Sequence, residues 1–291
     1  MRFFVYIFIS LFLSSCLKEE YPQNEFKEQL VVEGSIRQDR VAEVMLTLNM
    51  DKSEEISEET MRDKIVRWAV VHVTDVDRND TEKLIGMVDE RYPTRFVYKS
   101  SRIQGRIGGT YRLDITYSGR QWSAETTIPN PNKLYDIKME HVKDNLYRLQ
   151  AKIKPNAEGL PYMIRCATSF TEEDRPIYYP PALFGIFDSC EQENVITINR
   201  PIDYTNIAEY STLFLKFEDV HIEFCTMEKF GYKYWSVWEN CTLNSLNPVF
   251  PVDEVPPTNI TGGAAGIWMG YGVTSYIVRP VNIPIPPQQT Q

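Results

Sequence analysis

The chain contains three histidines, His72, His141 and His221, the residue type that most often binds metals or transfers protons in proteins. His72 and His221 lie inside alternating strand patterns, and neither has a second histidine two or four residues further on. Metal sites need several ligands that converge on one point. We therefore expect these histidines on strand faces, and we expect no metal site.

The segment Asp75-Val-Asp77-Arg-Asn79-Asp80 has the oxygen-rich start of a calcium-binding loop. Such a loop needs glycine at its sixth position and a bidentate acid at its twelfth. Those two positions hold Asp80 and Gly86, so the match fails. The segment is better interpreted as a turn between two strands.

No group of residues has the local context of a catalytic site. The chain lacks a G-x-S-x-G nucleophile elbow, and its many carboxylates do not single out a glycosidase pair. The glycine-rich run Gly262–Gly272 lacks the Lys-Ser/Thr pair that holds phosphate and magnesium, so we expect it to allow close backbone packing instead. We expect no cofactor and no enzymatic activity.

The best candidate for recognition is the proline- and aromatic-rich segment 176–187. Prolines disfavour regular structure, and aromatic rings supply contact area at low entropic cost. If the segment is exposed, it forms an apolar patch larger than a monomer normally shows. The alternative is that it folds back as a lid over the second core. The partner- or ligand-binding candidates are Tyr178, Tyr179, Phe184 and Phe187.

The N-terminus carries a secretory signal. Arg2 precedes Phe3–Leu13, 11 mostly apolar residues. As a helix they would span roughly 16 Å, about half of the bilayer core, so residues 1–15 are predicted to be a cleaved signal peptide. Leu13-Ser14-Ser15-Cys16 resembles the bacterial lipobox, in which the cysteine is acylated and cleavage falls before it. The alternative is an ordinary signal with an incidental cysteine.

Residues 16–28 are polar and are predicted to form a tether. Lys18, Glu19 and Glu20 follow the cysteine closely and resemble the surface-export signal of Bacteroidota lipoproteins. We expect a protein held in the outer membrane by acylated Cys16 and facing the cell exterior, since several acyl chains suffice for stable anchoring.

Composition narrows the range of partners. Lys and Arg total 31 against 40 Asp and Glu, a net charge of −9, which argues against binding to nucleic acid. The other four cysteines all lie in the second half of the chain, and their spacing fits either disulfides or free buried thiols. They are Cys166, Cys190, Cys225 and Cys241.

The fold is predicted to be mainly β, with two antiparallel sandwich-like domains. Residues 29–130 are predicted to form the first sandwich, because Tyr111–Tyr117 alternates cleanly and turns at Ser118-Gly119 into a hairpin. This domain resembles the small transthyretin- or Ig-like sandwiches. The acidic stretch 51–60 interrupts its strands and is predicted to be a solvated loop. Residues 131–279 form a second β-rich domain with one helix near 227–246, and 280–291 are a Pro/Gln tail.

Several segments occur in a distinctive order along the chain. They are Leu30-Val-Val-Glu-Gly34, Gly109-Thr-Tyr-Arg-Leu-Asp-Ile115, Ala124-Glu-Thr-Thr-Ile-Pro129, the Tyr-rich helix, and Asn259-Ile-Thr-Gly-Gly-Ala-Ala-Gly-Ile-Trp-Met-Gly270. With the lipobox, this order resembles the Bacteroidota lipoprotein family catalogued as domain of unknown function 4249. The usual last motif of the family has Gly-Gly, one small residue and Gly, followed by an aromatic residue. Here two alanines, Ala264 and Ala265, stand where that motif has one small residue. The resemblance implies an outer-membrane lipoprotein, often encoded beside a TonB-dependent transporter, and no known chemistry.

Two functions from different classes follow. The first is a non-catalytic accessory module that docks on a TonB-dependent transporter barrel and helps to capture an unidentified solute. The second is a structural or adhesive surface lipoprotein without a transported ligand. A surface hydrolase with a site built from distant residues is a weaker third possibility.

Overall fold

The computed structural model describes residues 26–279 except 52, 56, 172, 174, 202–210 and 246–253. This part of the chain is mainly β, as predicted, and it contains two helices. The helices are α2 (Glu58–Asp63) and α3 (Lys229–Ser245).

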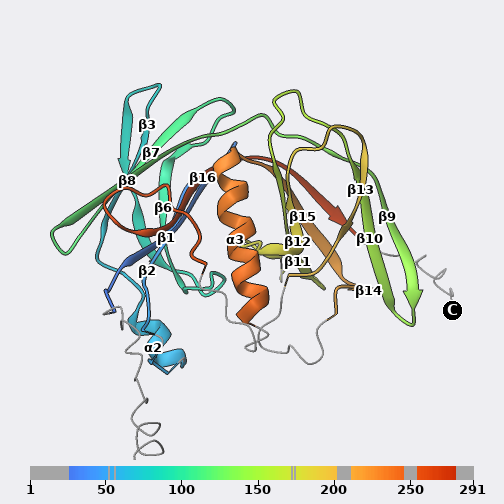
Figure 1. Cartoon of the computed structure of the whole chain (residues 1–291), viewed down its shortest axis with the longest axis horizontal. Helices are drawn as coiled ribbons and strands as arrows, with labels where there is room; N and C mark the ends of the chain where they lie inside the picture. The colour runs from blue at the N-terminus through green and yellow to red at the C-terminus, as the bar shows by residue number, and fades with distance from the viewer. Residues whose placement is uncertain are drawn as a thin grey trace, which may run out of the picture.

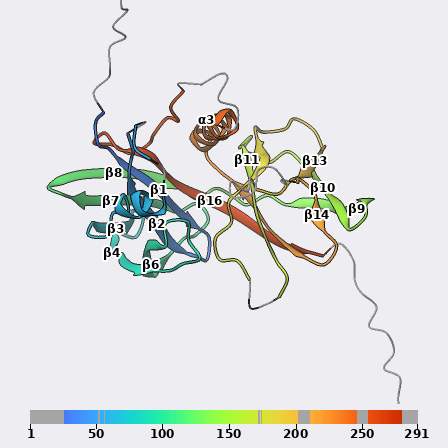
Figure 2. The same cartoon turned by 90° about the horizontal axis from the view of Figure 1, so that it is seen from below.

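One eight-stranded sheet runs through the whole protein. Its strands, in spatial order, are β12 (Pro181–Phe187), β11 (Tyr162–Ser169), β15 (Asp219–Thr226), β16 (Ala265–Val278), β1 (Leu30–Arg37), β2 (Val41–Leu48), β6 (Phe96–Gln104) and β5 (Ile85–Val88). Strand β16 lies at the centre and crosses from one half of the molecule to the other (Figures 1 and 2). Its first part pairs with β1 in parallel, and its second part pairs with β15 antiparallel. The predicted division near residue 130 falls between β8 and β9, and β16 completes the sheet on both sides of it.

The first half is a sandwich whose second sheet contains four strands. They are β4 (Asp80–Lys83), β3 (Val70–Asp75), β7 (Thr110–Tyr117) and β8 (Arg120–Thr127). Tyr111, Leu113 and Ile115 point into the first core, as their alternation predicted. Ser118 and Gly119 both have positive φ, which joins β7 to β8 in the predicted hairpin because such turns match the strand twist.

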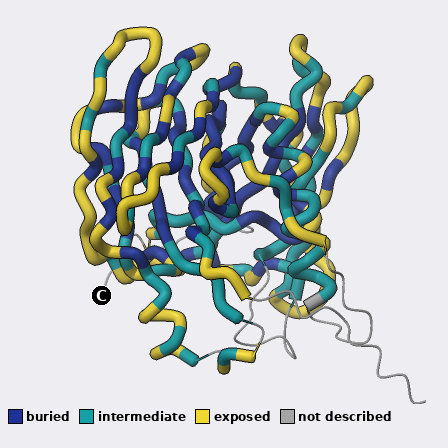
Figure 3. The backbone as a smooth tube through the Cα atoms, turned by 60° about the vertical axis from the view of Figure 1, so that its left-hand side comes forward, coloured by how far each residue is buried: buried dark blue, intermediate teal, exposed yellow. Residues whose placement is uncertain are grey.

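The second half repeats this arrangement with another small sheet. It contains β9 (Leu134–Lys143), β10 (Leu146–Ile153), β13 (Asn194–Ile198) and β14 (Phe214–Leu215). Alternate residues of β11 and β15, such as Ile164 and Ile222, face a second core shared with β10. In Figure 3 the buried segments run through the interior of both halves, whereas the turns are largely exposed.

Helix α3 lies between the two halves in Figure 1 and packs on the sheet face opposite to the cores. Its position agrees with the helix predicted near 227–246. Tyr234 and Trp235 share a buried cluster with Ile267 and Met269, the residues of β16 that alternate with those facing the first core. Within the described residues, neither helix is long and apolar enough to cross a bilayer.

The glycine-rich run is structural, as predicted. Gly266 has φ +98, and a Cβ at this position would lie 1.9 Å from the carbonyl oxygen of Val32. Only glycine therefore allows β16 to approach β1 closely enough to pair. Trp268 then reaches the first core, where its indole N–H donates to the Tyr111 carbonyl at 3.0 Å.

Two predicted irregular segments contain regular structure. The acidic stretch 51–60 was expected to be a loop, yet α2 begins at Glu58 because Ser57 and Thr60 form a reciprocal capping box. The proline-rich segment was expected to lack regular structure, but its residues from Pro181 onward form β12. This strand lies at the edge of the large sheet, where proline is tolerated.

Candidate functional site

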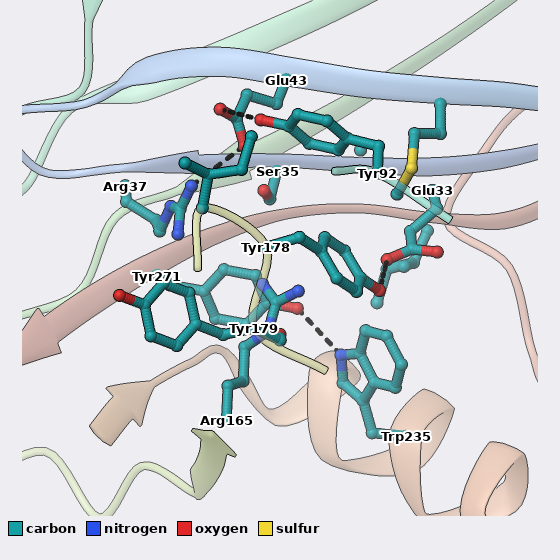
Figure 4. Close-up of a pocket in the computed structure, with 14 residues that line it drawn as sticks. Glu33, Ser35, Arg37, Glu43, Tyr92, Arg165, Tyr178, Tyr179, Trp235 and Tyr271 are labelled. Carbon is teal, nitrogen blue, oxygen red and sulfur yellow. Dashed lines mark hydrogen bonds and ion pairs between the residues drawn. The ribbon is translucent and has the colours of Figure 1, made fainter. Parts of the chain in front are cut away.

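Buried charged and aromatic residues gather where the first half, the second half and α3 meet (Figure 4). They come from β1, β2, β11, β16, α3, the connection between β5 and β6, and the segment that precedes β12. The cavity among them has a volume of about 20 Å³, which is room for about one water molecule and too small for a substrate. The residues labelled in Figure 4 are Glu33, Ser35, Arg37, Glu43, Tyr92, Arg165, Tyr178, Tyr179, Trp235 and Tyr271.

Arg37 links the two halves through a buried ion pair. Its guanidinium donates to both oxygens of Glu223 at 2.9 and 3.0 Å, and to Glu43 at 3.0 Å. Burial lowers the pKa of Arg37, but the two carboxylates outweigh that effect and raise it. Tyr92 donates to the second oxygen of Glu43 at 2.7 Å. The buried charges of Arg37, Glu43 and Glu223 are therefore neutralised by direct contact with one another, as buried ions require.

Tyr178 fills the space between the halves. Its hydroxyl donates to Glu33 at 3.0 Å, and its ring centre lies 5.4 Å from the Arg165 guanidinium carbon and 6.0 Å from the Tyr92 ring centre. Burial raises the pKa of Glu33, and the nearby Arg165 opposes this rise. Burial also raises the pKa of Tyr178, so its hydroxyl remains protonated and able to donate.

The structure separates the four aromatic candidates. Tyr178 lies in the polar cluster, and the Tyr179 carbonyl accepts a hydrogen bond from Arg165 Nε. Phe187 packs against the second core, whereas Phe184 is 55% exposed. The segment thus covers the charged face of the large sheet with its first part, and it exposes one ring from its second part.

Phe184 has an unusual backbone. Its φ is +54, a region that bulky residues avoid because Cβ approaches the carbonyl oxygen. Between the pairs Met163–Ile186 and Arg165–Pro181, β12 has four residues where β11 has one. This bulge turns the Phe184 ring outward, as bulges at sheet edges commonly do.

Glu239 of α3 fixes this bulge. Its carboxylate accepts a hydrogen bond from the Phe184 backbone N–H at 2.7 Å. Burial raises the pKa of Glu239, and hydrogen bonds from the Phe184 and Gly185 backbone oppose that rise. The helix therefore covers backbone donors that an edge strand would otherwise leave free.

The described residues contain no group of three or more His, Cys, Asp or Glu side chains arranged to hold a metal ion. His221 Nε2 lies 2.8 Å from the Ser169 hydroxyl on the neighbouring strand. The four cysteines among the described residues are free thiols, and burial raises the pKa of Cys166 and Cys225 to about 12. The expected lipidation residue Cys16 and the expected export signal Lys18, Glu19 and Glu20 lie outside the described residues.

The charged residues beneath Tyr178 were not predicted from the sequence. A signal for them exists in β1, where Glu33, Ser35 and Arg37 alternate with apolar residues of the first core. This alternation marks a polar face, but it does not show that another part of the chain covers that face.

The fold and the site define a two-part β-sandwich protein that buries a charged cluster at its junction and exposes an aromatic ring on an edge strand. The chain belongs to the family described as Domain of unknown function (DUF4249), whose model matches residues 18–276. No curated protein matches the chain.

One solved structure similar to the chain is that of the FN1–FN3 domains of chicken CNTN1. The similarity has a TM-score of 0.23 and 10% identity, over 85% of this chain and 66% of that one. The chain thus spans less than two thirds of that structure.

Proposed function

We propose that the protein is a lipid-anchored, non-catalytic module on the outer face of a bacterial outer membrane, where it docks on a TonB-dependent transporter barrel and assists solute capture. The N-terminal sequence supports the anchor, because Cys16 follows a short apolar segment and two small residues. Membership of the family fits this proposal but assigns no chemistry.

The observation that carries the docking role is the strained, exposed Phe184. A left-handed conformation costs a bulky residue roughly 1–2 kcal/mol, which glycine would avoid. The bulge and Glu239 maintain that conformation. Strain retained at an exposed aromatic residue points to binding, since aromatic residues dominate interface energetics.

The experiment is isolation of the protein from outer membranes in mild detergent, followed by mass spectrometry of the proteins that accompany it. We compare the wild type with Phe184→Gly and with Phe217→Ala, which removes a ring of similar exposure elsewhere. We expect a stoichiometric barrel with the wild type and the control, and at least a tenfold loss with Phe184→Gly. The melting temperature of Phe184→Gly should stay unchanged or rise, because glycine relieves the strain.

Retention of the barrel by Phe184→Gly would contradict the assignment of the docking residue. A lone lipoprotein would favour the structural or adhesive function instead. The anchor is tested separately, by the intact mass of the N-terminal peptide and by Cys16→Ser, which we expect to shift the protein from the membrane to the soluble fraction.

A further inference from the structure

A groove lies at the end of the first half where β1 begins, between α2 and residues 93–95. Its volume is about 670 Å³, within the range of ligand-binding sites. Four apolar side chains contribute to its lining, namely Met50, Met61, Ile65 and Pro93. Methionine adapts to different partner shapes, so this surface suits side chains rather than one rigid ligand.

The charge of the groove is opposite to that of the whole chain. The chain has a net charge of −9, yet the groove is lined by four basic and two acidic residues. They are Arg62, Lys64, Arg67 and Arg95, with Glu58 and Glu59. An acidic ligand would therefore meet a local positive potential on an otherwise acidic protein.

Two of the basic residues are already neutralised, and two are not. Lys64 pairs with Glu54 at 3.0 Å, and Arg95 pairs with Glu58 at 2.9 Å. Arg62 and Arg67 are exposed and form no ion pair with any residue that the structure describes. These two guanidinium groups can bind carboxylates in bidentate fashion without first breaking an internal ion pair.

The walls of the groove are held in place before any ligand binds. Residues Lys64 to Val66 pair with the end of β2, since Leu48 donates to the Lys64 carbonyl and Val66 donates to the Leu46 carbonyl. On the other side, Arg95 has φ +51, and its guanidinium is paired with α2. A site that is already formed loses little conformational entropy on binding.

The charge pattern favours a peptide over an anionic bilayer. Asp51, Glu55 and Glu59 lie in or beside α2, so a flat anionic surface would be repelled where it meets them. A peptide can place its carboxylates at Arg62 and Arg67 alone. We propose that this groove binds an acidic peptide segment that also carries a large apolar side chain. The inference is independent of the proposed docking through Phe184.

The test is fluorescence anisotropy with the purified chain from Cys16 onward and labelled nonapeptides. One peptide has three glutamates around a leucine and a tyrosine, a second has glutamines instead of the glutamates, and a third has lysines. We expect the acidic peptide to bind at least tenfold more tightly than the neutral one, and the basic peptide not to bind. The affinity for the acidic peptide should fall severalfold between 50 and 500 mM salt, because exposed charge pairs are screened.

Variants identify the site. Arg62→Glu and Arg67→Glu should each weaken binding of the acidic peptide at least tenfold, whereas Arg40→Glu reverses an exposed arginine in the β1–β2 turn and should leave it unchanged. Melting temperatures check that each variant is folded. Equal binding of all three peptides, or an equal effect of Arg40→Glu, would overturn the proposal. Arg62-dependent binding to phosphatidylglycerol vesicles without peptide binding would overturn it in favour of a membrane surface.

Discussion

The replacement Gly266→Ala tests the closest approach between β16 and β1. The added Cβ would lie 1.9 Å from the Val32 carbonyl oxygen, and an ordinary contact needs 3.4 Å, so the strands must separate by about 1.5 Å. Such a shift breaks the adjacent ladder hydrogen bonds, which contribute about 1 kcal/mol each. Two or three lost bonds, together with about 1–2 kcal/mol for the left-handed conformation of alanine, give about 4 kcal/mol of destabilisation.

Gly263→Ala is the matched control. Gly263 has φ +80, close to that of Gly266, but an added Cβ there would meet no atom within 4 Å. This variant should therefore lose only the conformational term, about 1–2 kcal/mol. The assay is urea unfolding of both variants, followed by tryptophan fluorescence, because Trp268 is fully buried. An equal loss in the two variants would refute the reasoning that the clash with Val32 dominates.

Three further predictions concern individual side chains. Tyr178→Phe leaves the Glu33 carboxylate without its hydroxyl donor and should lower the free energy of unfolding by about 1–3 kcal/mol; an unchanged value would show that this hydrogen bond is not formed. Although burial opposes the shift, hydrogen bonds from two serines and the neighbouring backbone lower the pKa of Glu82 from 4.5 to about 2. The contribution of ionised Glu82 to stability is therefore complete above about pH 4.5 and is lost as the pH falls toward 2. Glu82→Gln should lower the free energy of unfolding by about 1–2 kcal/mol at pH 7 and by less at pH 2. Urea unfolding at each pH measures the difference. Thiol labelling at pH 7 should modify Cys166 and Cys225 only after unfolding, because both are buried and burial raises their pKa to about 12. Mass spectrometry locates the labels, and a label on either cysteine in the folded protein would contradict its burial.

Short sequence patterns predicted the hairpin and the helix, because the structure of these elements depends mainly on residues close together in the sequence. The alternation in Tyr111–Tyr117 and the turn at Ser118-Gly119 specified the β7–β8 hairpin. The helical spacing of apolar residues specified α3. In each case side-chain periodicity and turn chemistry agree with the final structure, so tertiary contacts did not override them.

The sequence did not reveal features that depend on distant residues. The apolar pattern of β16 is compatible with a place in either half, and only the fold shows that it pairs with β1 and with β15. The aromatic segment contains neighbouring rings with opposite environments, because a bulge changes the direction of the side chains. The spacing of neighbouring residues in the sequence does not predict the hydrogen bond between Tyr178 and Glu33, which lies 145 residues earlier.

The central position of β16 has a consequence for how the protein acquires its structure during synthesis. Ala265 pairs with Val31, so the ribosome must translate more than two hundred intervening residues before β1 obtains its second neighbour. Until then, β1 and β15 each have one strand edge that lacks its partner. Contacts of such long sequence separation slow folding, and unpaired strand edges promote aggregation. Both halves should therefore reach their final packing together, after the last strand has been released, and a nonsense mutation just before Ala265 should prevent either half from folding.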